Sequence, residues 1–141
     1  MANGESHTFS LSVVTPEGAA YEGEAERLIV PGASGEIGVL ARHAPLVAML
    51  KAGEIRIRSD GEWQSFAAGP GYFKVQRDRA IVLVDDAVRA EEIDVEEARR
   101  EVEEARVLVE RAEAGEEGVD RWQAEQRLRH AENKISVAGG A

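Results

Sequence analysis

The spacing of apolar residues changes once along the chain, near Asp86, and this change divides the sequence into two parts. Up to Asp86, apolar and polar residues alternate in short runs that end at glycine, proline or Asp-Gly, a pattern typical of β-strands joined by turns. Glycine and proline are then absent from residues 87–114, where apolar residues recur every three or four positions, as on an amphipathic helix. We therefore expect a β-domain over residues 1–88 and a helical segment over residues 89–141.

The β-part contains at least eight short runs of this kind between His7 and Asp86. Asp60-Gly61 gives the strongest hairpin signal, because these residues accept the positive φ angles of a two-residue turn. Many short strands separated by turns at this spacing are typical of a β-sandwich or a barrel. The chain has 141 residues, of which 43% are apolar, which is enough for one compact core.

The helical part is predicted to form a hairpin of two antiparallel helices. Asp94 can cap the first helix, with Glu97 three residues later. Gly115 and Gly118 favour a turn after it, and the second helix is expected to begin near Asp120. The apolar stripes of the two helices consist of Val95, Ala98, Val102, Ala105, Val109 and Ala112, and of Ala124, Leu128, Ala131 and Ile135.

These two stripes are thin, because alanine and valine supply most of them. At about 25 cal/mol for each Å² of apolar surface removed from water, they stabilise the hairpin far less than a leucine-rich stripe would. The hairpin is therefore expected to be only marginally docked, which makes a conformational switch a reasonable hypothesis. Trp122 is expected to pack within the hairpin and not to act as a base-stacking platform.

The net charge of −10 argues against a nucleic-acid partner, because an acidic chain repels phosphates. The charge is uneven: residues 91–117 carry 12 acidic and 4 basic residues, whereas residues 118–141 carry 3 and 4.

No apolar run approaches the roughly 20 residues of a membrane-spanning helix, and the N-terminus has no basic segment followed by an apolar one. The sequence thus predicts a soluble protein with no direct membrane insertion, which is cytosolic if the source is bacterial.

The residue types of common catalytic and metal sites are missing or isolated. There is no cysteine, and His7, His43 and His130 have no second histidine or carboxylate at the spacing of metal ligands. Ser34 does not lie in a nucleophile-elbow motif. We therefore expect no catalytic residue and no metal, and interpret the chain as a non-enzymatic interaction module.

One segment carries a motif that is more informative than its pattern of apolar residues. Gly35-Glu36-Ile37-Gly38-Val39-Leu40, followed by His43-Ala44-Pro45-Leu46, resembles the signature of the epsilon subunit of F-type ATP synthase, in which a G-E-[LI]-G-[IV] run precedes H-A-P-L. Further segments match in the same order, so the resemblance covers essentially the whole chain. They are Val13-Val14-Thr15-Pro16, Ala25-Glu26, Gly53-Glu54-Ile55-Arg56-Ile57, Gly69-Pro70-Gly71-Tyr72 and residues 87–94.

The resemblance implies a mainly β plus α fold, with an N-terminal ten-stranded β-sandwich and a C-terminal two-helix antiparallel hairpin. It implies a non-catalytic subunit in the central stalk, or rotor, of a proton-translocating ATP synthase, at the cytoplasmic face of the bacterial plasma membrane. The implied partners are the gamma subunit, the ring of c subunits and the beta subunits. In this family the hairpin can fold on the sandwich or extend towards the beta subunits, where it inhibits ATP hydrolysis.

The resemblance also extends to single residues. Glu36 matches a glutamate that faces the c ring, and His43 matches a histidine that faces gamma. Judged from the residues alone, Glu36 could also be a solvated turn residue, and His43 could cap a strand turn. The cations of the second helix that suit an acidic surface of the beta subunits, in the extended state, are Arg121, Arg127, Arg129 and Lys134.

Some bacterial members of this family bind ATP through the motif [IL]-D-x-x-R-A, which here reads Ile93-Asp94-Val95-Glu96-Glu97-Ala98. Glu97 occupies the arginine position, and a carboxylate there repels a polyphosphate. The weak candidates for ATP binding are Ile93, Asp94, Arg99 and Arg100, and the two arginines could compensate only in a rearranged pocket. We therefore expect no cofactor. Two alternatives stay open: a nucleotide-sensing domain whose hairpin closes over ATP, and a generic adaptor that belongs to no motor.

Overall fold

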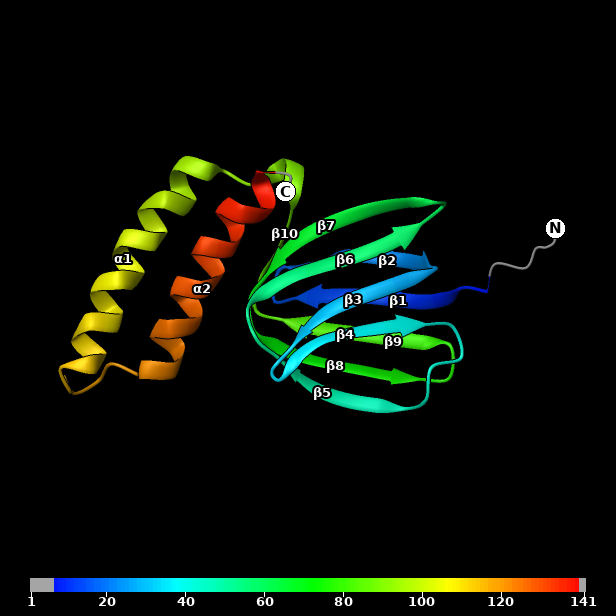
Figure 1. Cartoon of the computed structure of the whole chain (residues 1–141), viewed down its shortest axis with the longest axis horizontal. Coiled ribbons are helices and arrows are strands. Elements are labelled where there is room, and N and C mark those ends of the chain that lie inside the picture. Colours follow the sequence, from blue (N-terminus) through cyan, green and yellow to red (C-terminus); the bar gives the residue numbers. More distant parts are fainter. Residues whose placement is uncertain (1–6, 140–141) are drawn as a thin grey trace.

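The computed structural model describes residues 7–139, which form ten β-strands, one short 3-10 helix and two α-helices (Figure 1). The strands are β1 (Phe9–Thr15), β2 (Gly18–Ala25), β3 (Arg27–Gly32), β4 (Gly35–Leu40), β5 (Leu46–Leu50), β6 (Gly53–Ser59), β7 (Glu62–Ala68), β8 (Gly71–Gln76), β9 (Arg79–Val84) and β10 (Ala87–Arg89). The helices are η1 (Ala90–Glu92), α1 (Val95–Glu113) and α2 (Arg121–Ala138). No helix within residues 7–139 is both long and apolar enough to cross a membrane.

The strands form a sandwich of two layers in the order β10-β7-β6-β3-β5-β8-β9-β1-β2, and β4 pairs with β3. β1 and β9 are parallel, whereas the other paired strands are antiparallel. The pairing of β3 with β5 is reduced to one residue pair, Gly32 with Leu50, where the two layers meet. The ten-stranded sandwich expected from the resemblance is confirmed. β10 crosses the expected division after residue 88 and pairs with β7.

The core lies between the two layers and is built from strand side chains. Alternation along β1 turns Leu11 and Val13 inward, and Ile55 and Ile57 do the same on β6. The largest fully buried side chains are Phe9, Phe66, Phe73, Leu11, Leu28, Leu50, Ile55, Ile57, Val13, Val30, Val39 and Val75. Among residues 7–139, no residue of α1 or α2 belongs to this core cluster, so the sandwich does not need the helices to complete its core.

One turn and one strand show which conformations a local sequence pattern can predict. Asp60 and Gly61 have φ angles of 53° and 77° and join β6 to β7, as a two-residue hairpin turn requires. β2, in contrast, has no regular alternation, and the sequence pattern does not reveal it. It pairs along the whole of β1, with an irregularity between Val13 and Val14, so its neighbour sets its conformation.

The helical hairpin is confirmed, and its caps explain where the helices begin. Asp94 accepts a hydrogen bond from the backbone N–H of Glu97 at 3.1 Å, and Asp120 accepts one from Gln123 at 2.9 Å. The two glycines of the connecting loop have φ angles of 81° and 84°, which side-chain-bearing residues rarely adopt. Each helix therefore begins at an aspartate that the sequence had indicated.

The hairpin contacts the sandwich through α2, which packs against β6, β7 and η1, while α1 lies on the far side of α2 (Figure 1). The buried residues of the helices are alanines and valines only: Ala98, Val102, Ala105, Ala124, Ala131 and Val137. The expected thin apolar stripes are thus confirmed. The prediction that Trp122 packs within the hairpin is wrong, because this residue is 51% exposed and lies beside Pro70 and Asp85.

Candidate functional site

An exposed apolar face lies on the outside of β5, β8 and β9. Met49 stands directly opposite Tyr72, and Tyr72 opposite Leu83, so the three side chains form a row across the strands. Val47, two residues before Met49, points to the same side. The exposed fractions are 68% for Val47, 52% for Met49, 56% for Tyr72 and 47% for Leu83. These four residues, here called the apolar row, have the exposure of a protein-binding surface.

A shallow cavity of about 580 Å³ lies beside the apolar row. Lys74, Arg77 and Arg79 line this cavity. Lys74 lies between Val47 and Ile81 in cross-strand register, so basic and apolar side chains share one face. A matching partner would present an apolar ridge beside carboxylates. Sequence patterning did not reveal this face, because it depends on how three separate strands pair.

Glu36 is the second residue of β4 and follows the tight turn that connects β3 to β4. Its side chain is 67% exposed, and one carboxylate oxygen lies 4.0 Å from the guanidinium of Arg56. A cavity of about 370 Å³ touches both Glu36 and Met49. Glu36 is therefore accessible to a partner near one end of the apolar row.

His43 lies in the loop between β4 and β5, so the length of β4 separates it from Glu36. The ring Nδ1 of His43 is 2.6 Å from the carbonyl oxygen of Ala44. The backbone N–H of Arg42 donates a hydrogen bond of 2.8 Å to Asp78, which fastens this loop to the turn between β8 and β9. The structure thus places Glu36 and His43 at opposite ends of β4 and does not bring them into one site.

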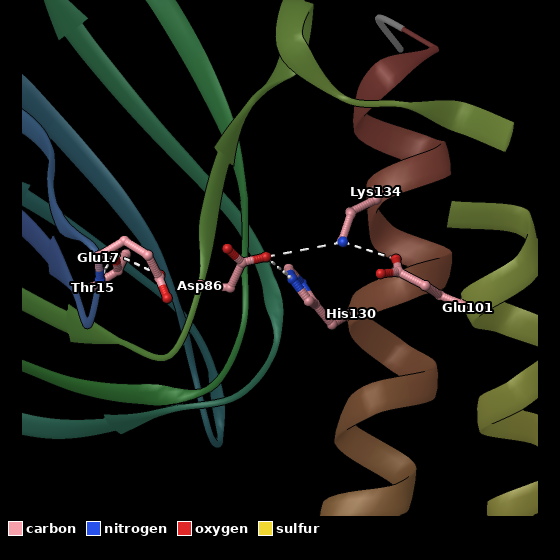
Figure 2. A network of polar contacts seen from close by, with 6 residues as sticks. All are labelled: Thr15, Glu17, Asp86, Glu101, His130 and Lys134. Carbon is pink, nitrogen blue, oxygen red and sulfur yellow. Dashed lines mark hydrogen bonds and ion pairs between the residues drawn. The ribbon is translucent and has the colours of Figure 1, made fainter. Parts of the chain in front are cut away.

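Four polar side chains connect the hairpin to the sandwich (Figure 2). Asp86, between β9 and β10, is 2.8 Å from Nε2 of His130 and 3.9 Å from Nζ of Lys134. Lys134 also donates a hydrogen bond of 2.8 Å to Glu101 of α1. The side chains of His130 and Lys134 are 14% and 11% exposed, so salt screens these contacts less than it would screen surface pairs. The docking network, as we call these four residues, therefore joins both helices to the sandwich.

The network is accompanied by pKa shifts of two adjacent aspartates in opposite directions. The hydrogen bond with His130 lowers the pKa of Asp86 below its ordinary value. Burial raises the pKa of Asp85. Sequence reasoning missed this network because 44 positions separate Asp86 from His130. His130 and Lys134 are four residues apart and so share one helix face, but the sequence does not show which carboxylates they contact.

Replacement of Lys134 by methionine should loosen the hairpin, because Lys134→Met leaves the carboxylates of Asp86 and Glu101 without their shared cation. Losing charged hydrogen bonds of this kind costs about 1–3 kcal/mol. The undocked population should then rise about 5- to 150-fold. The measurement is amide hydrogen exchange at Ala52, whose N–H donates a 2.9 Å hydrogen bond to α2. Arg129→Met, on the exposed surface of the same helix, is the control. Equal exchange in the two variants would contradict the role of the network.

The contribution of Asp86 to docking should disappear in acid. Because its pKa is lowered, its stabilisation is present above the ordinary value of 3.8 and is lost as the pH falls through the lowered pKa. The contribution of Asp85 to stability depends on pH in the opposite direction. Because its pKa is raised, its stabilisation is present below pH 3.8 and is lost as the pH rises through the raised pKa. The difference in docking free energy between the wild type and Asp86→Asn should therefore be largest near neutral pH and shrink in acid. Exchange at Ala52 measures it, and a difference independent of pH would refute the assignment.

The four cations of the second helix fall into two groups. Arg121 pairs with Glu125 at 3.1 Å, and Arg127 and Arg129 are exposed. Lys134, in contrast, is buried in the docking network. Three of the four cations are thus open to the surface, whereas Lys134 lies between Asp86 and Glu101.

The weak ATP candidates lie around the start of α1. Ile93 follows η1, and Asp94 caps α1. Arg99 pairs with Glu96 at 3.0 Å and is 63% exposed, and Arg100 is also exposed. Two of the cavities beside α2, of about 310 and 190 Å³, are lined by other residues, four of which are acidic. The structure therefore does not gather the candidates around either of these cavities.

Comparison with known proteins gives matches along almost the whole chain. Residues 8–90 match the family model of the ATP synthase delta/epsilon chain, beta-sandwich domain. The ATP synthase epsilon chain of Shouchella clausii is 39% identical over 133 residues, which cover 93% of this chain and 95% of the relative. The ATP synthase epsilon chain of Thermosynechococcus vestitus is 34% identical over 131 residues, with coverages of 93% and 95%.

Solved structures show the same fold. A chain of the Euglena gracilis mitochondrial ATP synthase, solved as an OSCP/F1/c-ring assembly, superposes with a TM-score of 0.74 at 24% identity, covering 96% of this chain and 85% of that chain. A chain of the central stalk and c ring of the Tetrahymena thermophila mitochondrial ATP synthase gives a TM-score of 0.56 at 13% identity, with coverages of 97% and 98%.

Proposed function

Because this chain belongs to the epsilon-chain family of ATP synthases, we propose that it is a non-catalytic subunit of the central stalk and couples rotation of the c ring to the catalytic head. The observation that carries the proposal is the apolar row, since four large exposed apolar side chains on one sheet face are costly unless a partner covers them. The gamma subunit is the proposed partner on this face. Glu36 is the proposed contact to the c ring and His43 a contact to gamma.

The helical hairpin is the proposed regulatory element, which inhibits ATP hydrolysis when it extends towards the beta subunits. Two observations support this role. The buried helical residues are alanines and valines, so leaving the sandwich exposes little apolar surface. Departure also breaks the contacts of Asp86 with His130 and Lys134. Lys134, which then keeps only its hydrogen bond to Glu101, joins Arg121, Arg127 and Arg129 as a set of cations for an acidic surface of the beta subunits.

The proposed location is the cytoplasmic face of the bacterial plasma membrane, where the other subunits hold the chain peripherally. Copurification tests the assignment. Tagged chain that is extracted from its own membranes should carry gamma and c subunits with it. A preparation that contains neither would contradict the motor assignment and favour an adaptor outside any motor.

The second candidate, a nucleotide-sensing domain, rests on the cavity of about 310 Å³ beside α2, which is lined by Trp122, Arg127 and His130. Glu97 in the motif and the carboxylates around α2 oppose a polyphosphate there. Isothermal titration of ATP into the isolated protein should therefore give no saturable heat. Saturation at millimolar or lower ATP would overturn this expectation and support closure of the hairpin over a nucleotide.

A further inference from the structure

The outer face of β3, β6 and β7 carries three arginines around one exposed tryptophan, and no role proposed above uses them. We propose that this surface, the arginine–tryptophan patch (Arg27, Arg56, Arg58 and Trp63), binds an acidic helix of a neighbouring protein. The inference does not rest on the proposed function. It rests on strand register, on side-chain contacts and on the charge of the chain.

Strand register brings the patch together. Arg27 of β3 stands opposite Arg58 of β6, and Arg58 stands opposite Trp63 of β7, so the three side chains form one row across the strands. Arg56 lies two positions before Arg58 and therefore on the same face. Leu40 of β4, which is 55% exposed, extends the row beyond Arg27. The patch lies beside the β6–β7 turn, whereas α2 contacts Ala52, just before the other end of β6.

The contacts within the patch hold its side chains in place. The guanidinium groups of Arg56 and Arg58 each lie 5.9 Å from the Trp63 ring, and Trp63 is 42% exposed. Arg58 forms an ion pair with Glu26 at 3.3 Å, whereas Arg56 has only a longer contact of 4.0 Å with the carboxylate of Glu36. Two guanidinium groups thus lie close to one aromatic ring. A ligand meets a surface whose side chains are already positioned.

The charge of the patch points to its partner. Like charges directly opposite each other in a sheet are destabilising, yet Arg27 and Arg58 occupy such a pair in a chain of net charge −10. Glu26 already pairs with Arg58, so added carboxylates would act mainly on Arg27 and Arg56, and they can accept paired hydrogen bonds from a guanidinium. Adjacent strands are about 4.8 Å apart, and carboxylates at positions i and i+4 of a helix are about 5–6 Å apart. An acidic helix therefore matches the spacing of the arginines.

An acidic helix fits better than a nucleic acid or an anionic membrane. Those ligands extend well beyond three arginines, and the rest of this acidic chain would repel them. Glu26 and Glu36 at the border of the patch also oppose a continuous layer of phosphates. A short helix with its own apolar residue can place carboxylates on the arginines and the apolar residue on Trp63 or Leu40.

The test follows Trp63 fluorescence in full-length protein that carries Trp122→Phe, so that Trp63 is the only tryptophan. The probe is an alanine-based helical peptide with glutamates at i and i+4 and one leucine. We expect saturable binding that weakens with added salt. The double variant Arg27→Glu/Arg56→Glu should lose at least about tenfold in affinity. The control variant Arg106→Glu, at an exposed position of α1 outside every surface proposed above, should bind as the parent does, and a peptide with glutamine in place of glutamate should not bind.

Three results would overturn the inference. The first is the absence of saturation by the glutamate peptide at low salt. The second is equal affinity of the parent and the Arg27→Glu/Arg56→Glu variant, with unchanged melting temperatures that show both to be folded. The third is tighter binding to phosphatidylglycerol vesicles or to single-stranded DNA than to the peptide, which would assign the patch to another class of ligand.

Discussion

Deletion of residues 94–141 should leave assembly of the complex intact and should raise its rate of ATP hydrolysis severalfold. Assembly persists because the core cluster, the apolar row, Glu36 and His43 all belong to the sandwich. Hydrolysis rises because the deletion removes the only segment proposed to reach the beta subunits. The measurement is ATPase activity of purified complex at equal subunit stoichiometry, compared with the full-length complex.

A point variant separates removal of the hairpin from its release. Asp86→Asn retains the hairpin and all its cations but weakens its docking, so it should favour the extended state and lower hydrolysis, opposite to the deletion. Glu132→Gln provides a control for the loss of one exposed negative charge, here on α2. If the deletion left hydrolysis unchanged while the subunit composition stayed constant, the hairpin would not be inhibitory in this protein, although the stalk assignment would stand.

Replacement of Tyr72 by aspartate should nearly abolish association with the stalk. Tyr72 lies at the centre of the apolar row, between Met49 and Leu83, so Tyr72→Asp would place an unpaired carboxylate inside the proposed gamma interface. Burial of such a group costs at least about 3 kcal/mol, which corresponds to a loss of about 100-fold in affinity. The measurement is the amount of gamma subunit that copurifies with tagged chain.

Val107→Asp provides a matched control, because Val107 is 52% exposed on α1 and Tyr72 is 56% exposed on β8. Both variants add one negative charge at an exposed apolar position, so an effect of net charge alone would appear in both. The Tyr72 side chain lies outside the core, and the melting temperature of the isolated variant should change little. Retention of gamma by Tyr72→Asp at the wild-type level would remove the apolar row from the interface.

Local patterns predicted those parts of the fold that are set within a few residues. The turn at Asp60-Gly61 and the helix start at Asp94 were predictable, because a positive φ and a capping side chain are local requirements. β2 was not predictable, because its residues do not alternate and its pairing with β1 fixes it. Trp122 was placed wrongly, because a helical pattern does not say which side of a helix faces a second domain.

The candidate sites also divide into those that a local motif identifies and those that depend on the tertiary structure. Glu36 and His43 were identified from a contiguous motif, but only the tertiary structure shows that they lie at opposite ends of β4, and their contacts to the c ring and gamma stay proposals. The apolar row and the arginine–tryptophan patch need the register of three strands each. The docking network needs a loop residue to meet a helix 44 positions later.

By itself, the sequence determined the change from strands to helices near Asp86, the caps and turns, the thin apolar stripes and the family resemblance. Each of these depends on the conformational preference of a few neighbouring residues or on the order of a motif. The tertiary structure alone decided which side chains share a face and that Lys134 lies between Glu101 and Asp86. Cross-strand register and helix docking bring distant positions to within a few ångströms, and no local preference encodes that proximity.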